Sequence, residues 1–164
     1  MTARYAGPVD PARLRQVFGS FPSGVTAVAA LVDGRPTGLA ASSFTSVSLD
    51  PPLVSVCIAH TSTTWPLLRR AARLGVSVLS AEQEGVGRRL SERRVDRFAA
   101  LSWRTTADGA VLLDGASAWL ECGVEDQIRA GDHDILLLRV HDLDAEAGVA
   151  PLVFHASRFR RLQP

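Results

Sequence analysis

The stretch from Gly38 to Ile58, GLAASSFTSVSLDPPLVSVCI, constrains the fold more than any other part of the chain. Its Asp50-Pro51-Pro52 turn fits neither a helix interior nor a central strand, because proline has no amide hydrogen to donate. The turn therefore joins two extended segments, one rich in Ser and Thr and one apolar. Small residues and hydroxyls before the turn would let a flat ligand approach and hydrogen-bond the backbone. A simple Ser/Thr-rich hairpin with a surface loop fits the same residues.

The remaining pattern is that of a mainly β protein. Asp33-Gly34 is a strong hairpin signal, and many short strands with only a few helices favour an antiparallel barrel with peripheral helices. The motif GxGxxG and a βαβ alternation are both absent, which argues against a Rossmann fold. Strands are predicted at 25–32, 35–48, 53–59, 75–79, 110–113, 116–129 and 134–144, with short strands within 152–162, and helices at 11–18, 65–73 and 82–94.

Length and charge narrow the class of protein. With 164 residues the chain is predicted to form one domain, 1–164, with a flexible N-terminal arm at 1–10. A net charge of +1 argues against a general binder of nucleic acid or of membrane surfaces. All 18 basic residues are arginine, so every cationic anchor is a guanidinium suited to phosphate.

Cysteine and histidine usage predicts no metal site and no disulfide. Cys57 and Cys122 each lie in an apolar run and are predicted to be reduced, unpaired thiols. His60, His141 and His155 lack a metal-ligand spacing. The N-terminus lacks the apolar core of a signal peptide, and no apolar run is long enough to span a membrane, so a cytoplasmic protein is expected.

Four further pieces stand in a recognisable order around the Gly38–Ile58 stretch. With that stretch they resemble the short-chain flavin reductases, the reductase components of two-component flavin monooxygenases, over about Phe18 to Phe159. The chain departs from the family pattern at Leu138, where glycine is usual, and at Ser77, where asparagine is common. The pieces are Phe21–Val28 (FPSGVTAV), Val78-Leu79-Ser80 with Gln83, Asp96-Arg97-Phe98 and Gly131-Asp132-His133.

The resemblance implies an FMN-binding split β-barrel that forms homodimers and takes FMN or FAD, with NADH or NADPH as hydride donor. In that interpretation two segments line the flavin ring, a Ser/Thr run near a helix N-terminus holds its phosphate, and an arginine adds positive charge. The run could equally be a plain N-cap of the helix that begins at Trp65. The implied residues are Ala41, Ser42, Ser43, Phe44 and Thr45 for one wall, Cys57, Ile58 and Ala59 for the other, Ser62, Thr63 and Thr64 for the phosphate run, and Arg89 for the charge.

The Gly131-Asp132-His133 turn is the candidate for the nicotinamide side. Gly131 permits an unusual backbone angle, Asp132 can fix the imidazole tautomer, and His133 can donate toward a bound ring or pyrophosphate. By itself the pair could be an ordinary turn, but the resemblance implies a place beside flavin and nicotinamide, with His133 as the catalytic residue. Hydride transfer between two rings needs stacking rather than a side-chain acid or base.

The sequence therefore predicts an NAD(P)H:flavin oxidoreductase that supplies reduced flavin to a partner monooxygenase. One alternative is a non-catalytic split-barrel protein that binds flavin or haem, and a second is an oxidase of the pyridoxamine-phosphate type. The Gly-Asp-His and Asp-Pro-Pro turns favour the reductase over the second alternative, and His133 favours it over the first. The residues leave FMN or FAD, and NADH or NADPH, open.

Overall fold

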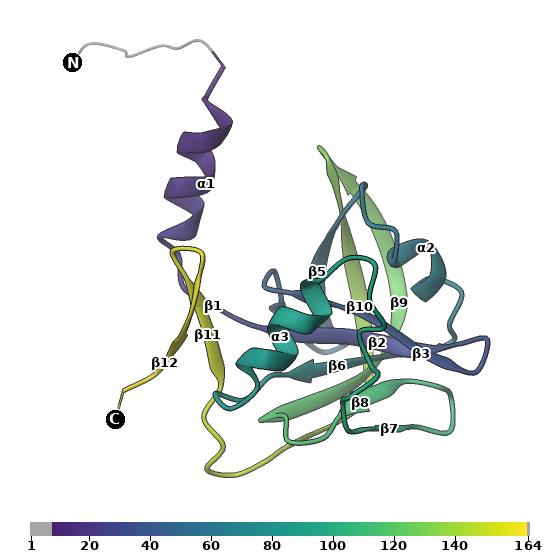
Figure 1. Cartoon of the computed structure of the whole chain (residues 1–164). Coiled ribbons are helices and arrows are strands. Elements are labelled where there is room, and N and C mark those ends of the chain that lie inside the picture. The colour runs from purple at the N-terminus through teal and green to yellow at the C-terminus, as the bar shows by residue number, and fades with distance from the viewer. Residues whose placement is uncertain (1–7, 164) are drawn as a thin grey trace.

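A seven-stranded antiparallel sheet, in the order β3-β2-β6-β9-β10-β5-β4, forms the body of the protein in the computed structural model, which describes residues 8–163 (Figure 1). The first seven residues of the predicted arm lie outside the described part. The helices are α1 (Pro11–Gly19), α2 (Trp65–Leu68) and α3 (Glu84–Ser91). The strands are β1 (Ser23–Gly24), β2 (Thr26–Val32), β3 (Arg35–Ala41), β4 (Thr45–Leu49), β5 (Pro52–Ala59), β6 (Leu74–Val78), β7 (Trp103–Thr105), β8 (Val111–Leu113), β9 (Ala118–Ala130), β10 (His133–Ala145), β11 (Leu152–His155) and β12 (Arg158–Arg161).

The sheet is held by apolar residues that alternate along its strands. In β5 the buried positions are Val54, Val56 and Ile58, and β10, its neighbour, buries Leu136 and Leu138. Because side chains of a strand point alternately to opposite faces, these residues form one continuous core. β2 is buried on both faces and so separates this core from a second one under α3. Strands make up 49% of the described residues and helices 13%, which confirms the prediction of a mainly β fold with peripheral helices.

Three predicted elements differ from the structure. The strand expected at 35–48 is interrupted at residues 42–44, because Ser43 turns out of the ladder to hydrogen-bond the backbone of Cys57. The helix expected at 65–73 ends at Leu68 and continues only as turns. The helix expected at 82–94 ends at Ser91, because the backbone at Glu92 is extended.

Gly75 marks a place where two backbones meet closely. A Cβ at this position would lie 2.0 Å from the carbonyl oxygen of Val111, which no side chain tolerates. β6 and β8 therefore meet in direct backbone contact at Val111, which belongs to the second core.

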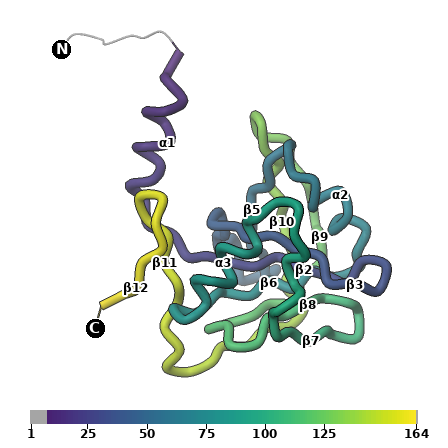
Figure 2. Tube along the Cα trace, in the orientation of Figure 1, coloured from purple at the N-terminus to yellow at the C-terminus, as the bar shows by residue number. Residues whose placement is uncertain are grey.

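The N-terminal helix α1 stands away from the barrel, next to the hairpin β11–β12 (Figure 2), whereas that hairpin packs Leu152, Phe154 and Phe159 against the second core. None of the α1 residues is buried. Val17, Phe18 and Phe21 are 59%, 69% and 77% exposed, an unusual state for such large apolar side chains. Among the helices of residues 8–163, none has the length and apolar character that a membrane crossing would need.

Candidate functional site

A cavity of about 710 Å³ opens between the ends of β3 and β5 and the loop after α3. One wall is Ala41, Ser42 and Ser43, and the facing wall is Cys57, Ile58 and Ala59, so the two predicted walls are brought together. Small and apolar side chains dominate both walls, which gives a slot suited to a flat ring. The rest of the lining is Leu39, Ala40, Thr61, Ser62, Thr63, Thr64, Leu90, Ser91, Arg93, Arg94, Arg97 and His133.

Ser43 joins the two walls. Its hydroxyl donates to the carbonyl of Cys57 at 3.1 Å and accepts from the amide of Cys57 at 2.8 Å. The hydroxyl thus makes two hydrogen bonds within the protein, and these tie the two walls of the slot together. Cys57 itself is a free thiol, as is the buried Cys122, whose pKa burial raises to about 12.

The Ser62–Thr64 run forms the floor beside α2. Ser62 Oγ accepts from the amides of Thr64 at 3.3 Å and Trp65 at 3.2 Å, so its hydroxyl bonds the backbone where α2 begins, although the N-cap residue itself, Thr64, makes no side-chain capping bond. Thr64 Oγ1 accepts from Arg97 Nη1 at 3.0 Å. Thr63 also lines the cavity. The run therefore combines the structural role with a place in the cavity.

Three arginines, Arg93, Arg94 and Arg97, supply the charge of the cavity, and within the described part of the chain its lining includes no carboxylate. Burial lowers the pKa of Arg97, and the neighbouring charge of Arg93 lowers it further. Uncompensated guanidinium groups of this kind favour an anionic ligand. The sequence pointed to Asp96-Arg97-Phe98 but assigned Arg97 no role.

The structure does not bring Arg89 to the cavity. Its guanidinium donates to the carbonyls of Asp96 at 2.7 Å and Arg97 at 3.2 Å. It thereby holds the loop that carries Arg97. Phe44 and Thr45 are also outside the lining, since the side chain of Phe44 packs against the core.

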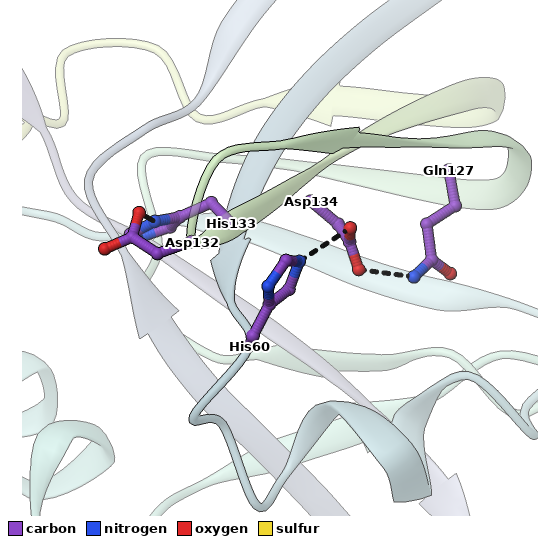
Figure 3. Close-up of polar contacts among 5 residues, drawn as sticks. All are labelled: His60, Gln127, Asp132, His133 and Asp134. Carbon is purple, nitrogen blue, oxygen red and sulfur yellow. Dashed lines mark hydrogen bonds and ion pairs between the residues drawn. The ribbon is translucent and has the colours of Figure 1, made fainter.

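His133 reaches the cavity from the first position of β10, while Gly131 and Asp132 form the turn behind it. Gly131 has φ +65°, which glycine adopts without strain. His133 Nδ1 lies 2.7 Å from Asp132 Oδ1 (Figure 3), and this hydrogen bond is the main cause of the lowered pKa of Asp132. With Nδ1 donating to the carboxylate, Nε2 is the nitrogen left for a ligand.

A second acid–histidine pair lies next to the first (Figure 3). His60 Nε2 is 2.9 Å from Asp134 Oδ1, and Gln127 Nε2 donates to Asp134 Oδ2 at 2.6 Å. These hydrogen bonds, that of His60 first, lower the pKa of Asp134. The sequence gave no signal for this cluster, because its residues lie on three different strands or their ends.

The fold and the cavity together define a β-barrel protein with a slot for a flat, anionic ligand. Residues 18–163 match the family described as "Flavin reductase like domain". The chain belongs to this family.

Named relatives agree with that assignment. The chain is 40% identical to a flavin reductase of Pseudomonas putida over 148 residues, which is 90% of this chain and 87% of the relative. It is 35% identical to the reductase subunit HsaB of a flavin-dependent monooxygenase of Rhodococcus jostii, over 97% of this chain and 82% of that one. The solved structure of the NADH:FAD oxidoreductase SgcE6 of Streptomyces globisporus, with NAD and FAD fragments, superposes with a TM-score of 0.90 at 39% identity, over 99% and 98% of the two chains.

These findings confirm the predicted fold, a split β-barrel of the flavin reductase type, and the predicted class of enzyme, an NAD(P)H-dependent flavin reductase. The donor set of the cavity fits the flavin that the family implies: apolar walls for the ring and arginines for the phosphate.

Proposed function

We propose that the protein transfers hydride from a reduced nicotinamide dinucleotide to a flavin held in the 710 Å³ cavity. The observation that carries the proposal is the lining itself, which among the described residues combines three arginines and no carboxylate with two walls of small and apolar residues. The arginines suit the anionic phosphate of a flavin, and the walls suit its flat isoalloxazine ring. The protein contributes by stacking the rings and holding the phosphate.

The proposed ring site is the slot between Ala41–Ser43 and Cys57–Ala59. The proposed phosphate site comprises Ser62, Thr63 and Thr64 together with Arg97. Phe44, Thr45 and Arg89 support these groups from outside the lining. His133 serves the nicotinamide, since it lies at the edge of the cavity with one ring nitrogen uncommitted.

FAD with NADH is the proposed pair of substrates. A second cavity of about 270 Å³ adjoins the first and shares Thr63, Thr64, Arg94 and Arg97 with it. FAD carries an adenylate beyond the first phosphate, and FMN does not. The adjoining cavity offers that adenylate a place, and the superposing SgcE6 structure is named for NADH and FAD.

The test is NADH oxidation with and without added free flavin, repeated for the four pairings of FMN or FAD with NADH or NADPH. Flavin-dependent turnover, fastest with FAD and NADH, is expected. A protein that binds flavin without oxidising NADH or NADPH would be the non-catalytic alternative. Turnover that is equal with FMN and FAD would refute the role of the second cavity and leave the reductase intact.

The proposed partners are a flavin-dependent monooxygenase in the cytoplasm, as the reductase-subunit relatives suggest, and a second copy of the chain. The exposed side chains of Phe18 in α1 and of Phe21 just after it support the homodimer, because large apolar side chains that stand away from the barrel are stabilised by burial against a partner. Sedimentation at micromolar concentration is expected to show a dimer that Phe18→Asp weakens. A monomer of the wild type would refute it.

A further inference from the structure

We propose that His60 is a positioning residue for His133. His60 lies directly after β5 and does not line the cavity, yet it holds the chain on both sides of His133. Its backbone amide donates to the carbonyl of Asp132 at 2.9 Å, and its ring Nε2 bonds to the carboxylate of Asp134 at 2.9 Å. The proposal rests on the proposed function, in which His133 serves the nicotinamide.

The carboxylate of Asp134 is the fixed point of this arrangement. Its side chain is 16% exposed, and each of its oxygens has its own donor, His60 from the end of β5 and Gln127 from β9. An ionised carboxylate only accepts hydrogen bonds, so the ring of His60 carries its proton on Nε2. The three strand ends that meet at the Gly131 turn are therefore tied together by side chains as well as by the ladder.

The two hydrogen bonds of His60 act on His133 through the backbone, since His60 itself does not line the cavity. Successive residues of a strand point to opposite faces, so Asp134 points away from the face to which His133 belongs. Figure 3 shows the two acid–histidine pairs diverging from the same turn. His60 thus holds the backbone of Asp132 and the side chain of Asp134, while Asp132 holds the ring of His133. Loss of the hydrogen bond between His60 and Asp134 therefore lets the His133 ring move relative to a nicotinamide.

The experiment compares His60→Ala, His60→Gln and the control His141→Ala, an exposed histidine of β10 that lines neither cavity. We expect His60→Ala to lower kcat/KM for NADH about three- to tenfold, with flavin Kd unchanged. Glutamine places an amide donor near the position of Nε2, so His60→Gln should restore most of the loss. The control should match the wild type. If His60→Ala does not fold, His60→Asn, whose amide is too short to reach Asp134, takes its place.

A double variant distinguishes a failure of the positioning role of His60 from a failure of the proposed role of His133. If His60 acts through His133, then adding His60→Ala to His133→Ala causes no further loss of kcat/KM. A further loss equal to that of the single variant would overturn the positioning role, as would unchanged NADH kinetics in folded His60→Ala. A lower melting temperature with unchanged kinetics would make His60 merely structural. If His133→Ala alone leaves NADH kinetics unchanged, the role of His133 itself fails and the positioning role falls with it.

Discussion

Replacing Arg97 with glutamine tests the proposed phosphate site most directly. The guanidinium is locked by three hydrogen bonds: Nε donates to Glu92 O at 2.7 Å, and Nη1 donates to Gly38 O at 2.9 Å and Thr64 Oγ1 at 3.0 Å. Among the described residues Nη2 has no hydrogen-bond partner, which leaves two donors available to a phosphate. Because the side chain is already ordered, binding costs it little further entropy.

The magnitude follows from the charges involved. A hydrogen bond to a charged group contributes about 1.5–3 kcal/mol, and two unit charges 4 Å apart interact by about 4 kcal/mol at an effective dielectric constant of about 20. Solvent and salt reduce the second figure at an open cavity. We therefore expect Arg97→Gln to raise the Kd for FMN about ten- to hundredfold. The lost bonds to backbone carbonyls should also lower the melting temperature.

The assay compares FMN with riboflavin, which has the same ring and no phosphate. Flavin fluorescence gives the Kd of both ligands for the wild type, for Arg97→Gln and for Arg69→Gln, an exposed arginine that lines neither cavity. Only the Kd of FMN for Arg97→Gln should rise, and the rise should shrink in high salt. If FMN and riboflavin weaken equally, then Arg97 acts by holding the loop, and the phosphate assignment is wrong.

Four other predictions follow from the same structure. His133→Ala should lower kcat/KM for NADH about ten- to hundredfold with little change in flavin Kd; unchanged kinetics in the folded variant would contradict it. Ser43→Ala should lower the free energy of unfolding by about 1–3 kcal/mol, because it leaves backbone groups of Cys57 unpaired, and Ser43→Trp should abolish flavin binding, as titration will show. Gly75→Ala should cost more than about 3 kcal/mol in chemical denaturation, and a stability equal to wild type would refute the close crossing. The lowered pKa of Asp134 means that its ionised form stabilises the fold above the unfolded pKa, near 3.9, and that this is lost as pH falls through the lower folded value. The stability gap to Asp134→Asn should therefore be full at neutral pH and close below about pH 4; a constant gap would refute it.

Local patterns predicted much of the fold. The alternation in β5 and β10 and the Asp33-Gly34 turn each report the conformation of a few neighbouring residues. They do not report which strands pair across long separations: β6 lies between β2 and β9, and β10 pairs with β5, through contacts between residues far apart in the chain. The break at residues 42–44 was missed for the same reason, because it depends on a bond from Ser43 to Cys57 across two strands.

The candidate site, like the fold, could be predicted only in part from the sequence. Both walls of the slot came from short, continuous motifs, and the structure brings them together. The arginine of the proposed phosphate site could not be chosen from the sequence, because α3 and the loop after it carry several. In the folded chain the guanidinium of Arg89 donates to backbone carbonyls outside the lining, whereas Arg97 lines the cavity. His60 and Asp134 are separated by 74 positions, so no local spacing announces their pairing.

The way the cavity uses its polar groups fits a reaction governed by ring placement. The hydroxyl of Ser43 is hydrogen-bonded to the opposite wall, and that of Ser62 to the backbone at the start of α2. Arg97 makes three hydrogen bonds to other groups of the protein. Each is thereby fixed in position and has little freedom to follow a moving proton. His133, the histidine of the lining, is held in the same way, because its Nδ1 is hydrogen-bonded to Asp132. A hydride that passes directly between stacked rings requires this kind of rigidity and no proton relay.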